Sequence, residues 1–328
     1  MQIQFRSMNV TTVCLLGGSG FIGRHICHLL AAGGYRARVA TRDRERAKQQ
    51  LILLPTVEVV ETDVHDPAAL REFVKGADAV VNLVGVLHEG RGESSFRAAH
   101  VELARKVVEA CRACGVRRLL HMSALNADPQ APSAYLRSKG EAEAIVRGSG
   151  LEVTVFRPSV VFGREDSFLN LFARLLKFSP FVVLACPDAR FQPVFVEDVA
   201  QAFVKSLQEI SSHGASYDLC GPRVYTLREL VEYVGAVTGR RRPVIGLNDT
   251  LSYWQAFAME WLPVKIMTRD NYYSMKVDSV CRCEFPFGIR PAALEAIVPG
   301  YLGGGTPRAR YQQLRGRARR DQSVDRES

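Results

Sequence analysis

The sequence lacks the features that mark membrane-spanning and secreted proteins. No stretch of its 328 residues approaches the ~20 consecutive apolar residues of a transmembrane helix. The first apolar segment, residues 11–16, has no small-residue cleavage site and runs directly into a glycine-rich turn, so it does not resemble a signal peptide. We therefore expect a cytoplasmic protein, with peripheral attachment to the inner face of the membrane as the alternative.

The sequence also has little that indicates a metal or redox site. Cys111 and Cys114 form a C-x-x-C at the end of an apolar helical segment, but no second C-x-x-C and no His pair accompanies them. Cys281 and Cys283 have no recognisable partner either. We expect the eight cysteines to be reduced and mostly buried, and we expect no metal.

Acidic residues are too few to balance the basic ones, and the net charge is +9. The excess is concentrated after Gly305, where residues 306–328 contain seven Arg and three acidic residues, a local charge of +4, with almost no apolar side chains. This composition predicts a disordered, solvated tail, and a contact with anionic lipid or an acidic partner is the alternative. No nucleic-acid recognition motif accompanies the tail, so nucleic acid is not an expected partner.

Strand and helix patterns alternate along the first half of the chain. Such alternation predicts right-handed βαβ units, and strands that are continuous Val/Leu runs are typical of a sheet covered on both faces. The fold class is therefore α/β, a Rossmann-type doubly wound parallel sheet with a smaller C-terminal α/β lobe. The expected strands are residues 11–16, 36–41, 57–61, 78–85, 116–124 and 151–159, and the expected helices are 67–75, 95–114 and 133–149.

After residue 160 the alternation is lost, which divides the chain into three parts. Residues 10–160 are expected to form the dinucleotide-binding domain, with 191–207 returning to it as a strand and a helix. Residues 161–305 form a smaller lobe for substrate or partner, and 306–328 the basic tail. In this lobe Trp254, Phe257, Ala258, Trp261 and Leu262 follow helical spacing, and we interpret them as a packed helix face rather than a membrane anchor.

The glycine-rich turn predicts a dinucleotide site. Gly17, Gly20 and Gly23 are spaced three apart between the first strand and the first helix. In this context one glycine permits a tight turn, one lets the backbone approach a pyrophosphate, and one lets helix and strand pack closely. The phosphates are then expected over the helix N-terminus, where free N–H groups attract anions.

The end of the second strand indicates which dinucleotide is bound. An acidic residue there holds a ribose hydroxyl, whereas a basic one accommodates a 2′-phosphate. Arg42 comes first, Asp43 follows, and Arg38 and Arg44 flank them. Because positive charge dominates, we favour NADP(H), with NAD(H) as the alternative.

A tyrosine and a lysine stand four residues apart, at Tyr135 and Lys139. On a helix this spacing places both side chains on one face. A cation beside the phenol would allow proton exchange near neutral pH. Alternatively, the protein only binds a nucleotide, and Lys139 serves as a ligand of that nucleotide without any catalysis by Tyr135.

These motifs resemble the short-chain dehydrogenase/reductase superfamily, in its extended or atypical branch. The resemblance covers about residues 10 to 205 and includes "GGSGFIG", "ETDVHD", "VVNLVG", Tyr-x-x-x-Lys, "FRPSVVFG" and "FQPVFVEDVA" in the family's order. The segments "HMSALNADPQAPSAYLRSKGEAE", "RPSVVFGREDSFLN" and "MTRDNYYSMKVDSV" further resemble the subunit nine-like NAD(P)-binding proteins of the complex I alpha subcomplex and their bacterial relatives. That group keeps the nucleotide fold, and some members are tied to ubiquinone biosynthesis or complex assembly.

The resemblance implies contacts for each part of a bound dinucleotide. It places Arg42 near the adenosine ribose, Asp63 and Val64 at the adenine edge, and Lys139 on the nicotinamide ribose. The expected pyrophosphate contacts are Gly17, Ser19, Gly20, Phe21, Ile22 and Gly23. The middle of the cofactor and the nicotinamide are expected to meet Leu83, Val84, Gly85, Val86, Phe156, Pro158 and Ser159.

The resemblance also implies a catalytic set. Tyr135 would exchange the proton as hydride moves, Lys139 would lower its pKa, and Ser123 would hold the reacting carbonyl. His100 stands where the extended family often has an asparagine, so a proton relay through that position is open, and packing near the cofactor is the alternative.

Three functions are compatible with these observations. The first is an NADP-dependent oxidoreductase acting on a carbonyl or quinone-like apolar substrate. The second is a non-catalytic nucleotide-binding accessory or assembly protein of a membrane-bound respiratory or quinone-synthesis complex. The third is a sensor of the NADP(H) ratio.

Overall fold

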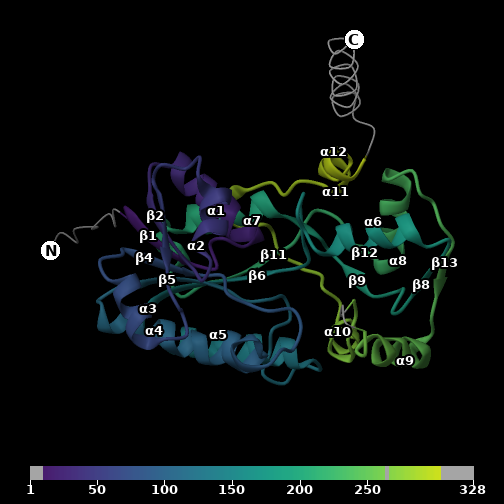
Figure 1. Ribbon diagram of the computed structural model, residues 1–328, viewed down its shortest axis with the longest axis horizontal. Coiled ribbons are helices and arrows are strands. Elements are labelled where there is room, and N and C mark those ends of the chain that lie inside the picture. Colours follow the sequence, from purple (N-terminus) through teal and green to yellow (C-terminus); the bar gives the residue numbers. More distant parts are fainter. Residues whose placement is uncertain (1–9, 263–265, 304–328) are drawn as a thin grey trace, which may run out of the picture.

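The central element of the protein is a seven-stranded parallel sheet with the strand order β11-β6-β5-β4-β1-β2-β3 (Figure 1). The computed structural model describes residues 10–262 and 266–303. The expected basic tail therefore lies outside the described residues. The strands are β1 (Thr12–Leu16), β2 (Arg36–Thr41), β3 (Val57–Glu61), β4 (Ala79–Asn82), β5 (Arg118–Met122), β6 (Glu152–Pro158) and β11 (Ser216–Leu219).

Helices cover both faces of this sheet, as its apolar strands require. One face carries α1 (Phe21–Ala32), α2 (Arg44–Leu51) and α7 (Val196–Ser206), and its core includes Ile26, Val199 and Phe203. The other face carries α3 (Pro67–Val74), α4 (Leu103–Ala113) and α5 (Ala134–Arg147), packed through Leu70, Val107 and Val146, among others. The predicted Rossmann-type doubly wound sheet is confirmed.

The smaller lobe lies beyond the carboxyl ends of the strands (Figure 1). Its core is formed mainly by α6 (Phe168–Phe178) and α8 (Leu227–Val237), through residues such as Phe172 and Leu230. Its strands pair in twos: β7 (Val161–Phe162) with β10 (Val194–Phe195), β9 (Arg190–Phe191) with β12 (Tyr225–Thr226), and β8 (Val182–Leu184) with β13 (Val244–Gly246). The remaining α-helices are α9 (Asp249–Met259), α10 (Arg269–Ser274), α11 (Leu294–Ile297) and α12 (Pro299–Leu302).

Of the expected strand and helix at residues 191–207, only the helix returns to the sheet. Helix α7 packs beside α1, whereas the short strands before it pair within the smaller lobe. The seventh strand is β11, which pairs with β6 and was not among the expected strands. Its sequence, "SYDL", is short and only its last residue is buried, so it carries little hydrophobic pattern.

Helix α9 corrects one expectation from the sequence. Its buried residues are Ser252 and Ala256, whereas Trp254 is 58% exposed and Trp261, just beyond the helix, is 81% exposed. Ser252 fixes the helix because its hydroxyl accepts a hydrogen bond from the Cys186 N–H (3.0 Å). The interpretation of the aromatic stripe as a packed helix face was therefore wrong.

The cysteines supply a second correction. Cys220 and Cys281 form a disulfide with a Cα–Cα distance of 6.0 Å, so the cysteines are not all reduced. Sequence spacing could not predict this bond, because the two residues are 61 positions apart and are brought together only by the fold. The other six cysteines are free thiols.

None of the helices in the described ranges combines the length and the apolar character needed to cross a membrane.

Candidate functional site

The glycine-rich turn forms a bare backbone surface at the start of α1. Gly17 has φ +80°, and a Cβ on it would lie 3.2 Å from the backbone of Leu83 and Val84. A Cβ on Gly23 would lie 2.5 Å from the Gly17 carbonyl oxygen, so that residue must also be glycine. Gly20 caps α1 without a side-chain hydrogen bond, and the first turn of α1 has no acidic residue. The N–H groups of that turn can therefore receive an anion.

The loop after β4 lies beside the glycine-rich turn and is held by specific hydrogen bonds. The Leu83 N–H donates to the Leu16 carbonyl (2.9 Å), and the Val84 N–H donates to the Asn82 side chain (3.2 Å). A Cβ on Gly85 would lie 3.0 Å from Lys139 Nζ. The expected middle of the cofactor groove therefore contacts the glycine-rich turn at one end and Lys139 at the other.

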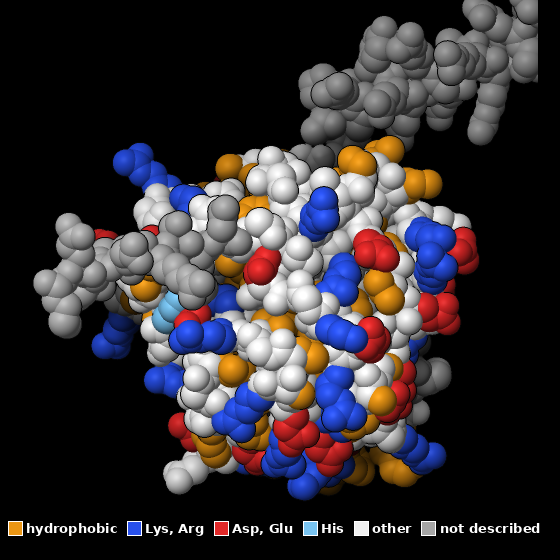
Figure 2. Space-filling view, turned by 90° about the vertical axis from the view of Figure 1, so that its left-hand side faces the viewer, with side chains coloured by type: hydrophobic (Ala, Val, Ile, Leu, Met, Phe, Trp, Pro, Cys, Tyr) orange, Lys and Arg blue, Asp and Glu red, His pale blue; other side chains and the backbone are white. Residues whose placement is uncertain are grey.

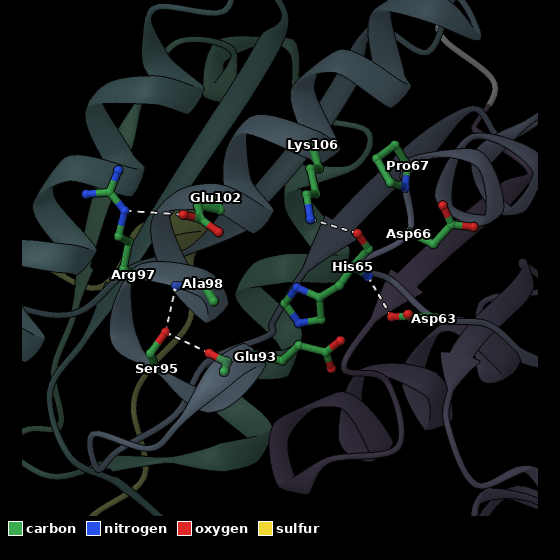
Figure 3. A pocket seen from close by; sticks show the side chains of 11 residues that line it. Asp63, His65, Asp66, Pro67, Glu93, Ser95, Arg97, Ala98, Glu102 and Lys106 are labelled. Carbon is green, nitrogen blue, oxygen red and sulfur yellow. Dashed lines mark hydrogen bonds and ion pairs between the residues drawn. The ribbon is translucent and has the colours of Figure 1, made fainter.

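A cavity of about 580 Å³ opens at the expected adenine end (Figure 3). The Arg97–Glu102 ion pair lies on one wall, and Asp63 and Asp66 lie on the opposite wall. Asp63 accepts a hydrogen bond from the His65 N–H (2.8 Å), which fixes the turn after β3. The half-buried Val64 packs against the core beneath it.

The residues expected to select the cofactor have different roles in the structure. The Asp43 carboxylate caps α2 by accepting from the Arg46 N–H (3.0 Å), so its charge is used in the helix cap. Arg38 stacks over Phe73 and donates to the Lys75 carbonyl (2.7 Å), on the side facing α3. Arg42 is exposed and lies 3.6 Å from Glu93, which lines the cavity.

Ser123, Tyr135 and Lys139 come from the end of β5 and from the first turns of α5. Ser123 is 2% exposed, and its hydroxyl has no hydrogen-bond partner within the described part of the chain. The Lys139 ammonium donates to the Met122 carbonyl (3.1 Å), one residue before Ser123. Thr56 and Tyr233 also have buried hydroxyls without a partner there, so the Ser123 hydroxyl is distinguished by its position next to the carbonyl that holds Lys139.

Burial shifts the pKa of both members of the Tyr–Lys pair, in opposite directions. It lowers the pKa of Lys139 to about 8, because the charged ammonium loses solvation. Burial, with a smaller contribution from Asp270, raises the pKa of Tyr135 to about 12. The phenol is therefore protonated at neutral pH and can act as a proton donor.

His100 is a buried supporting residue within a π-helical turn, Arg97–Glu102, which precedes α4. Its Nε2 accepts from the Val86 N–H (3.1 Å), so Nδ1 carries the proton and donates to Ser138 Oγ (2.8 Å). Burial and the Lys139 charge lower the pKa of His100 to about 2. The imidazole is therefore neutral, and its two hydrogen bonds connect the loop after β4 to α5.

The residues at the end of β6 and just after it have different surroundings. The Phe156 side chain is wholly buried against Phe203, so it belongs to the core, and only its backbone reaches the site, by accepting from the Ser123 N–H (2.8 Å). The Pro158 carbonyl accepts from the Leu125 N–H (3.0 Å). Ser159 donates to the Ser279 carbonyl (2.9 Å) and so ties β6 to the smaller lobe.

Asp270 is a site residue that the sequence did not indicate. It lies on α10, and its carboxylate accepts from the N–H groups of Ala134 (2.6 Å) and Tyr135 (3.1 Å) at the start of α5. The segment around it was recognised only as part of a resemblance, because a cap that comes from another element leaves no local sequence pattern.

Together these features fit a nicotinamide dinucleotide: a bare glycine turn, a helix N-terminus without acid, a buried lysine and an unpartnered hydroxyl. Bound there, the dinucleotide would have its pyrophosphate at Gly17, Ser19, Gly20 and the start of α1, and its nicotinamide end near Lys139. Phe21 and Ile22, at the start of α1, are half-buried beside this turn.

Comparisons with known proteins agree with this architecture. Residues 13–220 match the family described as "NAD dependent epimerase/dehydratase family". Subunit 9 of the mitochondrial NADH dehydrogenase [ubiquinone] 1 alpha subcomplex from Mus musculus is 30% identical over 299 residues, which are 88% of this chain and 79% of the relative. The ceramide reductase of Caulobacter vibrioides is 34% identical over 193 residues, 58% of this chain and 59% of the relative.

Among solved structures, the dTDP-glucose 4,6-dehydratase DesIV from Streptomyces venezuelae superposes with a TM-score of 0.63 at 22% identity, over 72% of this chain and 84% of that chain. At this identity the likeness supports the fold. The family match and the subunit 9 relatives confirm the resemblance inferred from the sequence motifs. The chain is a member of the NAD-dependent epimerase/dehydratase family, within the extended short-chain dehydrogenases/reductases, and binds a nicotinamide dinucleotide.

Proposed function

We propose that the protein is an NADP(H)-dependent reductase of a carbonyl or quinone-like substrate. The observation that carries the proposal is the buried Ser123 hydroxyl without a partner, at the end of β5 and beside the Met122 carbonyl that holds Lys139. A carbonyl oxygen is the group that such a hydroxyl would bind. The reductase named among the relatives acts on a ceramide, and this supports an apolar substrate.

The side chains divide the chemistry between them. Ser123 Oγ donates a hydrogen bond to the substrate oxygen and orients it. The Tyr135 phenol gives its proton to that oxygen as negative charge develops there. Lys139 binds the ribose of the cofactor, and its ammonium, one helical turn from Tyr135, would stabilise the phenolate left after proton transfer. When bound, the reduced nicotinamide supplies the hydride.

Arg42 supports the choice of NADP(H). With Asp43 used in the α2 cap, the exposed guanidinium of Arg42 is the nearer charge for a 2′-phosphate, and its partner Glu93 lines the adenine-side cavity. We expect Arg42→Ala to weaken NADPH binding by roughly tenfold while NADH binding changes little. Isothermal titration of both coenzymes measures this, with exposed Arg36→Ala as the matched control. Equal losses for the two coenzymes would contradict the selection of NADP(H) by Arg42.

The experiment that tests catalysis is Tyr135→Phe. It removes the proton donor and keeps the ring that packs against Phe96 and His100. NADPH affinity should stay within about twofold of wild type, whereas consumption of NADPH with a panel of ceramide, quinone and carbonyl substrates should fall by 10² or more. Ser123→Ala should have the same signature, and Ser274→Ala, at the end of α10, is the control.

A second candidate is a nucleotide-binding accessory or assembly protein of a respiratory or quinone-synthesis complex. The mouse subunit 9 relative, similar over 88% of this chain, favours it. In that case the Lys139 contact with the ribose is the function that matters. Tyr135→Phe would then leave complex activity in cells unchanged, whereas Lys139→Met would reduce it together with nucleotide affinity.

A further inference from the structure

The smaller lobe has an exposed apolar surface at the end of the molecule farthest from the edge strand β3. Strands β8 and β13 each present one side chain outward, Val183 (40% exposed) and Ile245 (50% exposed), and these are register partners. Phe181 lies two residues before Val183, and period-2 alternation places it on the same face. Phe178, at the end of α6, is 79% exposed nearby.

Helix α9 extends this surface. The Gln255 side-chain amide donates to the Val183 carbonyl (2.9 Å), so α9 lies along the free edge of β8. Leu251 lies one helical turn before Gln255, and Trp254 immediately precedes Gln255 in the sequence. The side chains of Leu251 and Trp254 are each more than half exposed. We call Phe178, Phe181, Val183, Ile245, Leu251 and Trp254 the aromatic surface.

Basic side chains border the aromatic surface. Arg240, Arg241 and Arg242 are exposed and immediately precede β13, and the Pro243 carbonyl after them accepts from the Val182 N–H (2.9 Å). Lys177 lies over the Phe178 ring at 5.2 Å. Within the described ranges no carboxylate forms an ion pair with these three arginines, so their charge remains available to an external anion.

The opposite end of the molecule has a different character. Figure 2 shows it with Lys and Arg side chains interspersed with Asp and Glu and with apolar groups scattered among them, and Ile52 and Leu53 lie exposed near the β3 edge. Mixed charges of this kind are typical of a solvated surface. The aromatic surface instead combines large apolar side chains with unpaired arginines, and the acidic residue in the first turn of α9, Asp249, is paired with Lys276.

We infer that the aromatic surface docks on an anionic lipid bilayer, with Trp254, Phe178 and Phe181 entering the interface and Arg240–Arg242 and Lys177 contacting lipid phosphates. Aromatic rings favour the boundary between headgroups and acyl chains, and unpaired basic residues are attracted to anionic headgroups. Charge complementarity favours lipid over a second copy of this chain, because two copies meeting through this surface would bring their arginines together. The inference does not rest on the proposed reductase activity, since binding is measured without turnover.

The chain contains its own reporter for this surface. Its two tryptophans are Trp254, within α9, and Trp261, just beyond it, and Trp261→Phe leaves Trp254 as the only one. The full-length Trp261→Phe protein should sediment with vesicles of phosphatidylcholine and phosphatidylglycerol. Its emission should shift to shorter wavelength, and brominated lipid should quench it. Vesicles of phosphatidylcholine alone should bind it much more weakly, and added salt should release it from the mixed vesicles.

Two variants and their matched controls test the two halves of the surface. Changing Arg240, Arg241 and Arg242 to Gln should weaken binding at least ~10-fold, and Phe178→Ser with Trp254→Ser should do the same in the sedimentation assay. The charge control changes the exposed Arg36, Arg71 and Arg105 to Gln, which removes the same net charge elsewhere. The apolar control is Ile52→Ser with Leu53→Ser, which are 76% and 85% exposed near the β3 edge.

Circular dichroism of every variant checks that the fold is intact. The inference is overturned if wild type does not bind the mixed vesicles, if binding leaves Trp254 emission unchanged, or if the controls lose as much as the variants. If the charge control lost as much vesicle binding as the Arg240–Arg242 variant, binding would depend on the overall charge of the protein and not on this surface. Concentration-dependent dimerisation that Trp254→Ser abolishes, without vesicle binding, would assign the surface to a second copy of the chain.

Discussion

At the scale of single residues, burial shifts both side chains of the Tyr–Lys pair toward their neutral forms. The pKa of Tyr135 rises and that of Lys139 falls, each chiefly because the charged form loses solvation. The sequence predicted that the two side chains share a helix face, and the hydrogen bond from Lys139 to Met122 is consistent with that placement. The expected lowering of the Tyr135 pKa by Lys139 is not seen, because burial and Asp270 both raise that pKa.

The lowered pKa of Lys139 predicts a pH-dependent stability. Between the native pKa of about 8 and the unfolded pKa of 10.5, the unfolded state holds a proton that the native state has released. The Lys139 contribution to the free energy of unfolding therefore rises with pH, by roughly 1 kcal/mol from about pH 7 to about pH 9. Urea titrations at several pH values, wild type against Lys139→Met, measure this contribution. If the difference between the two proteins is the same at each pH, the lysine is not perturbed by burial.

Sequence reasoning located the residues whose role depends on backbone geometry or local spacing. Gly17 and Gly23 were predicted because the turn requires them, and Tyr135 and Lys139 because helical spacing pairs them. The state of His100 could not be predicted, since its two partners, Val86 and Ser138, come from different elements. Its neutral tautomer follows from tertiary contacts alone.

At the scale of elements, the start of α5 depends on a cap from the smaller lobe. The Ser133 hydroxyl accepts a hydrogen bond from the Leu136 N–H (3.2 Å). The Asp270 carboxylate of α10 accepts from the N–H groups of Ala134 and Tyr135. A carboxylate at this end also interacts favourably with the helix dipole. The helix that carries Tyr135 and Lys139 is thus held by both parts of the molecule.

We expect Asp270→Ala to lower the free energy of unfolding by ~1–2 kcal/mol, because two N–H groups lose their acceptor. Exposed Asp188→Ala in the same lobe is the matched control for loss of one charge. Hydrogen exchange of the Ala134 and Tyr135 amides should accelerate in the Asp270 variant. Unchanged exchange at these amides would show that the cap contributes nothing to the start of α5.

The outcome for α9 shows the limit of helical periodicity. The stripe from Trp254 to Leu262 predicted a helix correctly, and α9 covers Asp249–Met259. Periodicity identifies an apolar face but does not show what covers it. Here small residues, Ser252 and Ala256, make the contact with the lobe, and the large side chains are left outside.

At the scale of the whole molecule, the end of β11 is joined to the segment after α10. The Cys220–Cys281 disulfide makes one connection. Gln192 makes another, since its amide donates to the Gly221 carbonyl (2.6 Å) and accepts from the Cys281 N–H (2.9 Å). The parallel sheet was predictable from alternation along the chain, whereas these connections join segments whose sequences carry no mutual pattern.

The disulfide closes a loop of 61 residues, and cross-linking a chain over this length restricts the unfolded state. Reduction should therefore lower the free energy of unfolding by roughly 2–4 kcal/mol, seen as a lower urea midpoint with dithiothreitol than without it. Cys220→Ser combined with Cys281→Ser should start at the lower midpoint and not respond to the reductant, while Cys283→Ser, at an exposed free thiol, should behave as wild type. Thiol titration in denaturant without reductant decides whether the bond forms at all, because the structure leaves six free thiols and a fully reduced chain has eight. Eight thiols in protein purified without reductant would remove this connection and leave Gln192 to hold the two segments together.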